Sequence, residues 1–309
     1  MNPNPFLVAL TPRADYTPHL IKNAVHTVLD ASGWQPGKSR VLVKPNLLRA
    51  HMLSCAHPEV VAATCAWLLD QGCTVAVADS PGFGSAIGVA EAIGLTQALK
   101  PLGLKVQDLG KTTVVPVPLP DGRSWGVSAL AVESDAILSI PKVKAHSQLR
   151  LSLGVKNLFG CVCGLRKAVA HTVQGPSLAE FSDAMVALWA ALPPAAGLAD
   201  GVQAMHVTGP SNGKPYALGC LGASSSVAAL DTALYTILGA RPEVIPLWEA
   251  LRRRGETAAE PENIHFPLDT PQDFPADTFE VPPLLMDVSF RPSRLLISLA
   301  KRLWLAWRA

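Results

Sequence analysis

Several sequence features that would indicate a common class of protein are missing from this chain of 309 residues. Only 16% of the residues are charged and the formal net charge is +2, which argues against a nucleic-acid-binding protein that relies on bulk electrostatics. No apolar run reaches the roughly 18 residues that a membrane-spanning helix needs. Residues 1–9 lack the basic region that begins a secretory signal peptide. We therefore expect a cytoplasmic protein with no nucleic-acid partner.

Signatures of metal, nucleotide and hydrolase sites are also missing. The six cysteines include no CxxC pair, only Cys161 and Cys163 separated by one residue, so we expect reduced thiols and no zinc framework. No GxGxxG, GxSxG or HExxH motif is present. The loop 209–215 (GPSNGKP) is one residue shorter than a Walker loop, and Pro215 stands where a magnesium-binding hydroxyl would be needed. A Walker-type nucleotide site is therefore excluded, although Lys214 of this loop remains a candidate for binding an anion.

Short apolar runs alternate with amphipathic stretches along most of the chain. Strands are predicted over 40–44, 73–78, 104–109, 113–117, 136–140 and 216–223, and helices over 59–71, 85–99, 227–238 and 243–254. A capping box, Ser177 with Glu180, predicts the start of a further helix that runs to about residue 191. This alternation predicts an α/β fold with a mainly parallel, doubly wound sheet flanked by helices. Residues 1–290 are expected to form this domain, either as one unit or as two α/β lobes with a boundary near 120–135.

The most informative segment is rich in lysine and follows the strand predicted over 136–140. Residues 140–146 read IPKVKAH, and residues 154–160 read GVKNLFG. Ligands of α/β proteins usually bind at the carboxyl ends of strands, and lysines there are costly unless an anion or a carboxylate faces them. We therefore predict that these segments bind an anionic small molecule through Lys142, Lys144, Lys156 and Asn157, and that His146 transfers a proton.

Two other strand ends add candidate residues. Lys44 and Asn46 flank Pro45 after the strand 40–44, where they would donate to a phosphate or carboxylate, unless Lys44 forms a salt bridge at the turn. Asp79 follows the strand 73–78 and is a candidate to take a proton, the alternative being a helix-capping or turn aspartate. A divalent metal ion is compatible with this site, and its candidate ligands are Asp79, His146 and Asp200.

The C-terminal segment 291–309 differs from the rest of the chain. On a helical wheel, five basic residues share one face, and leucines and tryptophans cover most of the remainder. Such a basic amphipathic helix suits an anionic membrane surface, whereas the alternatives are packing on its own domain or on a partner protein. A peripheral membrane location is therefore one alternative to a purely cytoplasmic one.

Taken together, these motifs resemble domain-of-unknown-function family 362, whose members are often described as iron–sulfur cluster-binding proteins. The matching stretches, in the family's order, are 41–48 (VLVKPNLL), 79–82 (DSPG), 140–146, 154–160, Lys167 with His171, 199–201 (ADG), 209–215, 230–234 (LDTAL) and 237–240 (ILGA). Many members continue into a ferredoxin-like module that this chain lacks, so the resemblance does not imply an intrinsic iron–sulfur cluster here. The family also tends to have Asp-Pro where this chain has Ser225-Ser226 before Asp231, which leaves the role of Asp231 open.

A second likeness is to the nickel-pincer lactate racemases, in which a histidine after a strand is followed by glycines and a lysine. His146, Gly154 and Lys156 stand in that order here. Two classes of function follow from the residues and the resemblances. The first is an enzyme that acts on an anionic small molecule, with or without a metal ion. The second is a non-catalytic carrier of a metal, cluster or cofactor that serves an electron-transfer partner. A third interpretation is structural, with lysines that only tie loops together through salt bridges.

Overall fold

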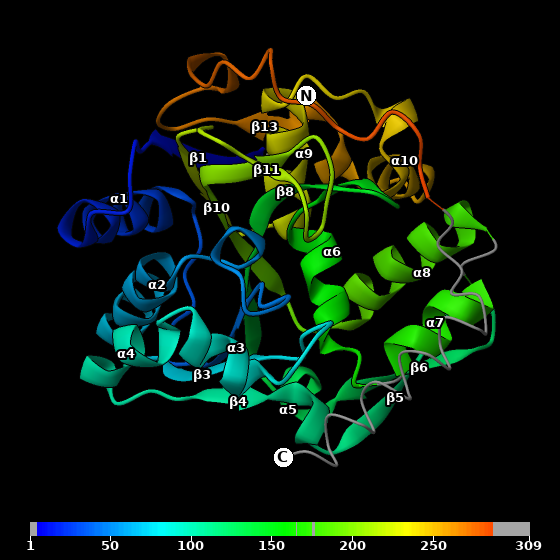
Figure 1. Ribbon diagram of the computed structural model, residues 1–309, viewed down its shortest axis with the longest axis horizontal. Coiled ribbons are helices and arrows are strands. Elements are labelled where there is room, and N and C mark those ends of the chain that lie inside the picture. Colours follow the sequence, from blue (N-terminus) through cyan, green and yellow to red (C-terminus); the bar gives the residue numbers. More distant parts are fainter. Residues whose placement is uncertain (1–4, 165, 175–176, 287–309) are drawn as a thin grey trace.

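One large sheet runs through the computed structural model, which describes residues 5–164, 166–174 and 177–286 (Figure 1). Its main path has the order β13 (Ile264–His265), β1 (Phe6–Pro12), β12 (Cys220–Ser224), β10 (Ala195–His206), β7 (Ala136–Ile140), β2 (Arg40–Pro45), β3 (Thr74–Asp79) and β4 (Val106–Asp108). Strand β12 is antiparallel to both of its neighbours, and every other pair on this path is parallel. The predicted α/β fold with a mainly parallel sheet is confirmed.

Shorter strands extend this sheet around β10. Strand β8 (Lys142–His146) follows β7 after Pro141 and pairs in parallel with β10, and β9 (Arg150–Ser152) returns antiparallel to β8. Strand β11 (Lys214–Tyr216) pairs antiparallel with the end of β10. Strands β5 (Val114–Pro118) and β6 (Ser124–Ser128) form a separate two-stranded hairpin. The chain therefore places β8 and its lysines directly beyond the carboxyl end of β7.

Helices cover both faces of the sheet (Figure 1). One layer holds α1 (Pro18–Ala31), α2 (Pro58–Asp70), α3 (Ala86–Ala92) and α4 (Leu95–Leu99), and the other holds α6 (Gly154–Leu158), α8 (Leu178–Ala191), α9 (Val227–Ile237) and α10 (Pro246–Arg253). Helices α5 (Ala129–Val132) and α7 (Arg166–Gln174) lie against the β5–β6 hairpin. Val41 and Val43 pack with the first layer and Leu42 packs with the second, because successive strand residues point to opposite faces.

Local signals explain where several elements begin and end. Ser177 caps α8 by accepting a hydrogen bond from the backbone N–H of Glu180 at 3.2 Å, as the capping box predicts. The helix predicted over 85–99 is instead two helices, because Gly94 between α3 and α4 has φ +82° and cannot continue a helix. The strand predicted over 216–223 is also two strands, β11 and β12, with Gly219 at φ +69° between them.

Three other predictions can be placed against this fold. The strand predicted over 113–117 forms as β5, but it joins the hairpin and not the main sheet. The boundary predicted near 120–135 falls on β6 and α5, while β2 before it and β7 after it pair in the same sheet. Within the described ranges no helix is long and apolar enough to cross a membrane. The predicted amphipathic helix 291–309 lies outside the described residues.

Candidate functional site

The predicted site residues converge where the order of the parallel strands reverses. From β2 the chain passes to β3 and then β4 on one side, whereas β7 pairs with β2 on the other side. Such a switch point leaves a crevice outside the carboxyl ends of the strands, where α/β proteins bind ligands. Residues that follow β2, β3 and β7 are therefore brought to one edge although they lie far apart in the sequence.

Lys44 and Asp79 form a buried ion pair at this edge. Lys44 Nζ lies 2.8 Å from Asp79 Oδ1 and donates to Asn157 Oδ1 at 2.8 Å. The Asp79 carboxylate also accepts the backbone N–H of Leu47 at 2.8 Å and that of Ser80 at 2.7 Å. Since both of its oxygens are engaged, Asp79 is built as a counter-ion, and the geometry matches the salt-bridge alternative for Lys44.

Asn157 and Gly160 hold this ion pair against helix α6. The Asn157 amide nitrogen donates to the backbone oxygen of Lys44 at 2.9 Å and to Ser139 Oγ at 3.0 Å. A Cβ atom at Gly160 would lie 2.7 Å from Asp79 Oδ1 and would also overlap the end of the Lys44 side chain. The 154–160 motif therefore needs an asparagine and a glycine at these positions for close packing against the pair.

A second buried ion pair, Lys142 with Asp200, belongs to a group that we call the Asp200 network: Tyr16, His57, Lys142 and Asp200. Lys142 Nζ lies 3.0 Å from Asp200 Oδ2 and donates to the Tyr16 hydroxyl at 2.6 Å. The fully buried Asp200 carboxylate accepts the Tyr16 O–H at 2.6 Å and the backbone N–H of His57 at 2.8 Å. The rings of Tyr16 and His57 stack 3.7 Å apart, and burial lowers the pKa of His57 to about 4.

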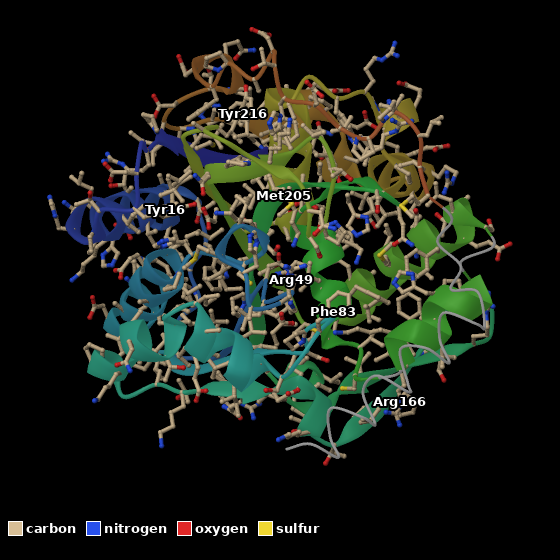
Figure 2. All side chains as sticks on the ribbon, viewed as in Figure 1. Tyr16, Arg49, Phe83, Arg166, Met205 and Tyr216 are labelled. Carbon is tan, nitrogen blue, oxygen red and sulfur yellow. The ribbon has the colours of Figure 1, made fainter. Side chains whose placement is uncertain are left out.

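Neither Tyr16 nor His57 was predicted to take part in a site. Tyr16 comes from the loop before α1, and Figure 2 shows it beside that helix. His57 is the N-cap residue of α2. No periodicity or motif marks either residue, so only the folded chain reveals that they surround Asp200.

Strand β8 presents a row of basic side chains on one face. Lys142, Lys144 and His146 alternate along the strand, while Val143 packs with the core on the opposite face. Lys144 Nζ donates to Asn46 Oδ1 at 2.6 Å and to the backbone oxygen of Ser54 at 3.0 Å. Burial lowers the pKa of Lys144 to about 8. The Lys144 ammonium group therefore donates to neutral oxygens, whereas the Lys142 ammonium group pairs with a carboxylate.

His146 is buried at the end of this row. Its Nδ1 accepts the backbone N–H of Gln148 at 3.1 Å, which assigns the proton of the neutral ring to Nε2. Burial lowers the pKa of His146 well below its usual value, and the charges of Lys156 and Lys144 lower it further. The imidazole is therefore neutral at pH 7 and carries an N–H proton that it can donate.

Lys156 and Lys167 complete what we call the lysine cluster: Lys44, Lys144, Lys156 and Lys167. Lys156 comes from α6 and is half-buried, and its Nζ lies 4.8 Å from the centre of the Phe159 ring. Burial lowers the pKa of Lys156 to about 7, and the charges of neighbouring lysines contribute to this shift. Lys167, from α7, donates to the backbone oxygen of Ser80, and burial lowers its pKa to about 8. Lys167 was not among the predicted binding residues, although the motif that pairs it with His171 marked it.

Across the described residues, no three His, Cys, Asp or Glu side chains are grouped as a metal site would need. Asp79 and Asp200 each accept backbone donors and a lysine, and they belong to different groups from His146. The predicted metal ligands therefore do not fit a divalent cation in this arrangement.

Cys161 and Cys163 do not form a cluster site either. Both thiols are buried, and burial raises the pKa of each. Cys163 donates to the backbone oxygen of Leu109 at 3.2 Å. Two thiols held in this way have the surroundings of structural cysteines.

The 209–215 loop packs against the chain next to His146, but its lysine, Lys214, lies away from the lysine cluster. Lys214 is exposed on β11, and among the described residues no hydrogen bond or ion pair joins it to the lysine cluster. Gly209 packs so tightly that a Cβ atom would overlap the Ala145 carbonyl oxygen, and its own carbonyl accepts the Ser147 N–H at 3.0 Å. The loop therefore packs against the turn that directly follows His146.

The loops after β2 and β3 border the site. Arg49 and Phe83, both labelled in Figure 2, follow β2 and β3, and the Phe83 N–H donates to the Leu48 carbonyl at 3.2 Å. Phe83 as a residue is 62% exposed, so this border of the site is open to solvent.

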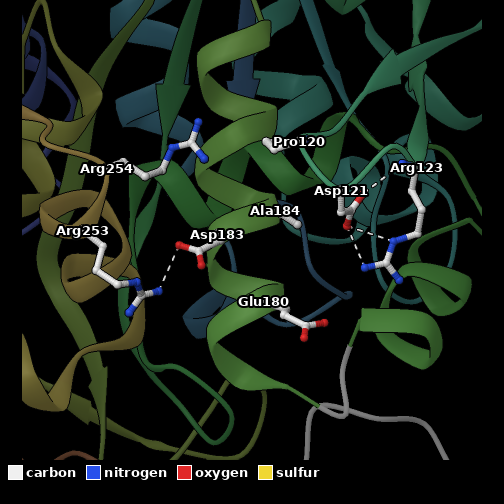
Figure 3. Close-up of a pocket in the computed structure, with 8 residues that line it drawn as sticks. All are labelled: Pro120, Asp121, Arg123, Glu180, Asp183, Ala184, Arg253 and Arg254. Atoms are coloured by element: carbon white, nitrogen blue, oxygen red, sulfur yellow. Dashed lines mark hydrogen bonds and ion pairs between the residues drawn. The ribbon is translucent and has the colours of Figure 1, made fainter.

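A separate surface cavity of about 520 Å³ is drawn in Figure 3. It is lined by Pro120, Asp121, Arg123, Glu180, Asp183, Ala184, Arg253 and Arg254. Arg123 pairs with Asp121, and Arg253 pairs with Asp183. Because these charges compensate one another in solvent, the cavity lacks the unbalanced charge of the lysine cluster.

Comparisons with known proteins agree with the motifs. The model of a family described as a domain of unknown function (DUF362) matches residues 41–236. A thylakoid-associated protein of Synechocystis sp. is 36% identical over 281 residues, which cover 88% of this chain and 84% of that protein. The lactate racemase apoprotein from Thermoanaerobacterium thermosaccharolyticum aligns with a TM-score of 0.48 and 14% sequence identity. The alignment covers 72% of this chain and 55% of the racemase chain, so this chain spans about half the length of that structure. The chain therefore belongs to the family of the domain of unknown function DUF362.

Proposed function

We propose that this protein binds a small anionic molecule, a phosphate ester or a carboxylate, at the lysine cluster. One observation carries the proposal: Lys144, Lys156 and Lys167 gather at the switch point of the sheet, and no described carboxylate forms an ion pair with any of them. The cluster's one carboxylate, Asp79, is already paired with Lys44. Such an excess of buried positive charge is unfavourable by itself and favourable once an anion binds.

The lowered pKa values support the same proposal. Lys144, Lys156 and Lys167 have pKa values of about 8, 7 and 8, so a part of each is neutral near pH 8 when the site is empty. A bound anion favours the charged form of a lysine and raises its pKa. Binding is therefore expected to take up protons and to weaken as the pH rises from 7 to 9.

The neighbouring groups suit an enzyme more than a passive carrier. His146 is neutral and bears a proton on Nε2, so it can donate a hydrogen bond to an oxygen that becomes negative during a reaction. The alternative of a metal, cluster or cofactor carrier has no grouped ligands among the described residues to support it. Elemental analysis of the purified protein tests that alternative directly, since a stoichiometric metal would favour it.

Calorimetric titration tests anion binding. The full chain is titrated with inorganic phosphate, pyrophosphate and oxalate at pH 7 and pH 9, in two buffers of different ionisation enthalpy. We expect binding with proton uptake, at least tenfold weaker in Lys144→Gln. The matched control is Lys214→Gln, which removes an exposed lysine and should leave the affinity unchanged. The absence of heat with all three anions, or an equal loss in the control, would refute the proposal.

We also propose that the C-terminal segment brings the protein to an anionic membrane surface. The support is the basic amphipathic pattern of residues 291–309 together with the thylakoid association of the relative that is 36% identical. Full-length protein should sediment with vesicles that contain phosphatidylglycerol and remain free of vesicles of phosphatidylcholine alone. A Lys301→Glu/Arg302→Glu variant should lose this binding, and equal sedimentation of both proteins would contradict the proposal.

A further inference from the structure

We infer that Lys156 is an amine nucleophile that forms an imine with the carbonyl carbon of an anionic aldehyde or ketone. The inference rests on the proposed function, because the lysine cluster would hold the anionic group while Lys156 reacts. The substrate class is thereby narrowed to small molecules that carry both a carbonyl group and a phosphate or carboxylate.

Lys156 differs from the other members of the lysine cluster in having no polar partner among the described residues. Lys44 is held by Asp79 and Asn157, and Lys144 and Lys167 each donate to oxygen atoms. Lys156 Nζ instead lies over the Phe159 ring, with no hydrogen bond or ion pair to any described residue. The Lys156 residue is half-buried and not sealed within the core. An amine with no partner to displace is free to attack.

The charges around Lys156 favour its neutral form. Lys44, Lys144 and Lys167 oppose its protonation, and Asp79, whose charge is shared with Lys44, favours protonation only in part. The neutral His146 adds no charge at pH 7. With a pKa of about 7, a large fraction of Lys156 carries a free lone pair at neutral pH. Neighbouring cations and burial are the two means by which proteins activate lysine nucleophiles.

Helix α6 fixes the position of this amine. Asp231 from α9 accepts the backbone N–H groups of Gly154 at 2.7 Å and of Val155 at 2.9 Å. A Cβ atom at Gly154 would overlap the Val227 side chain, so the helix start is packed tightly against α9. Asp231, whose role the sequence left open, is therefore a positioning residue for the segment that carries Lys156.

The step requires no oxidant, reductant or further reactant. The Lys156 lone pair attacks the carbonyl carbon, the C=O electron pair moves to oxygen, and this oxygen gains a proton while the nitrogen loses one. The carbinolamine then takes a proton on its hydroxyl group and expels water as the C=N bond forms, and the resulting iminium nitrogen releases a proton. An amine and a carbonyl compound thereby become an imine and water. His146, which is neutral at pH 7 and has its proton on Nε2, is suited to donate a hydrogen bond to the carbonyl oxygen as this oxygen gains negative charge, and solvent water supplies the protons.

Labelling with pyridoxal 5′-phosphate, which has an aldehyde and a phosphate, tests the inference. The full chain is incubated with the probe, reduced with sodium borohydride and digested for peptide mass spectrometry. We expect labelling of Lys156 at least tenfold faster than of Lys214, and suppressed by inorganic phosphate. Its rate should rise with pH around 7, whereas an ordinary lysine responds near its usual pKa of about 10.4.

Two variants and a second probe separate this inference from the proposed function. Lys156→Arg keeps the charge but cannot form an imine, so it should bind phosphate and lose the label. Lys144→Gln should bind phosphate at least tenfold more weakly while pyridoxal, which has no phosphate, still labels Lys156. Phosphate binding without preferential labelling of Lys156 would overturn the imine inference alone. Labelling of Lys156 by both probes with no phosphate binding would overturn the anion site, and with it the substrate class inferred here.

Discussion

The Asp200 network and the lysine cluster lie at the same end of the sheet and differ in what faces their lysines. In the Asp200 network, Lys142 meets a fully buried carboxylate at 3.0 Å and a tyrosine hydroxyl at 2.6 Å. In the lysine cluster, Lys144 meets only neutral oxygens and Lys156 meets an aromatic ring. Both groups contain lysines at the same end of the sheet. The group that faces each lysine therefore decides whether the lysine stabilises the fold or remains available to a ligand.

Strand β8 carries both kinds of lysine two residues apart. Lys142 and Lys144 share one face of the strand, yet only Lys142 is opposite Asp200 on β10. Balanced charges hold a structure together, whereas unbalanced charges reduce stability until a ligand neutralises them. The contrast predicts opposite effects of removing a lysine from the two groups.

The largest effect is expected for Lys142→Met, which leaves the buried Asp200 carboxylate without its cation. Removing one partner of a buried ion pair typically costs about 3–5 kcal/mol of unfolding free energy. Urea denaturation measures this loss, and phosphate affinity at the lysine cluster should change less than twofold. A loss below about 1 kcal/mol would mean that the Asp200 network is not structural and would break the comparison.

A smaller loss is expected for Asp231→Asn. The asparagine amide would turn an N–H donor toward the backbone N–H groups of Gly154 and Val155, so at least one of their hydrogen bonds is lost. We expect a loss of about 1–3 kcal/mol of unfolding free energy and weaker phosphate binding, because α6 carries Lys156. Asp183→Asn, on the exposed surface of α8, is the matched control. Unchanged affinity in a destabilised Asp231→Asn protein would show that α6 does not position the site.

Lys156→Met should change stability in the opposite direction. The substitution removes a half-buried cation that has no polar partner in the described part of the chain. The ligand-free protein should therefore gain about 1–2 kcal/mol of unfolding free energy, less than full burial would imply. Phosphate binding should weaken at the same time. Lys214→Met should stay within about 0.5 kcal/mol of the parent protein in stability. A destabilised Lys156→Met variant would place Lys156 with the structural lysines.

The smallest effect is a pH dependence of stability without ligand. In the folded protein Lys156 has a pKa of about 7, and Lys144 and Lys167 have pKa values of about 8, whereas an unfolded lysine stays charged to about pH 10. The unfolded chain therefore binds more protons, and Lys156 contributes most at the lower end of this window. The unfolding free energy should therefore rise between pH 7 and 8.5, by about 1 kcal/mol. Lys156→Met should have a flatter profile, and saturating phosphate should reduce the slope. A fall in stability over this window in the parent protein alone would contradict the lowered pKa of Lys156.

The sequence predicted the scaffold of the site well because its signals are local. Period-two apolar runs located β2, β3 and β7, and the residues after these strands had to meet at one edge of a parallel sheet. Gly94 and Gly219 were missed as breaks because a single glycine does not reveal its φ angle in advance. Lys214 was predicted as a binding residue because its loop is rich in glycine, whereas the loop serves to pack against Ala145 and Ser147.

The sequence by itself determined the α/β fold, the family and the edge of the sheet where charged residues gather. Only the tertiary structure decided which lysine faces a carboxylate and which faces neutral groups. Tyr16 reaches Asp200 across 184 positions, and Lys144 reaches Asn46 across 98. Hydrophobic periodicity repeats within one element and can be read locally, but a charge pair forms between elements that meet only after folding. The chemistry of this site therefore depends on long-range pairing that no local pattern encodes.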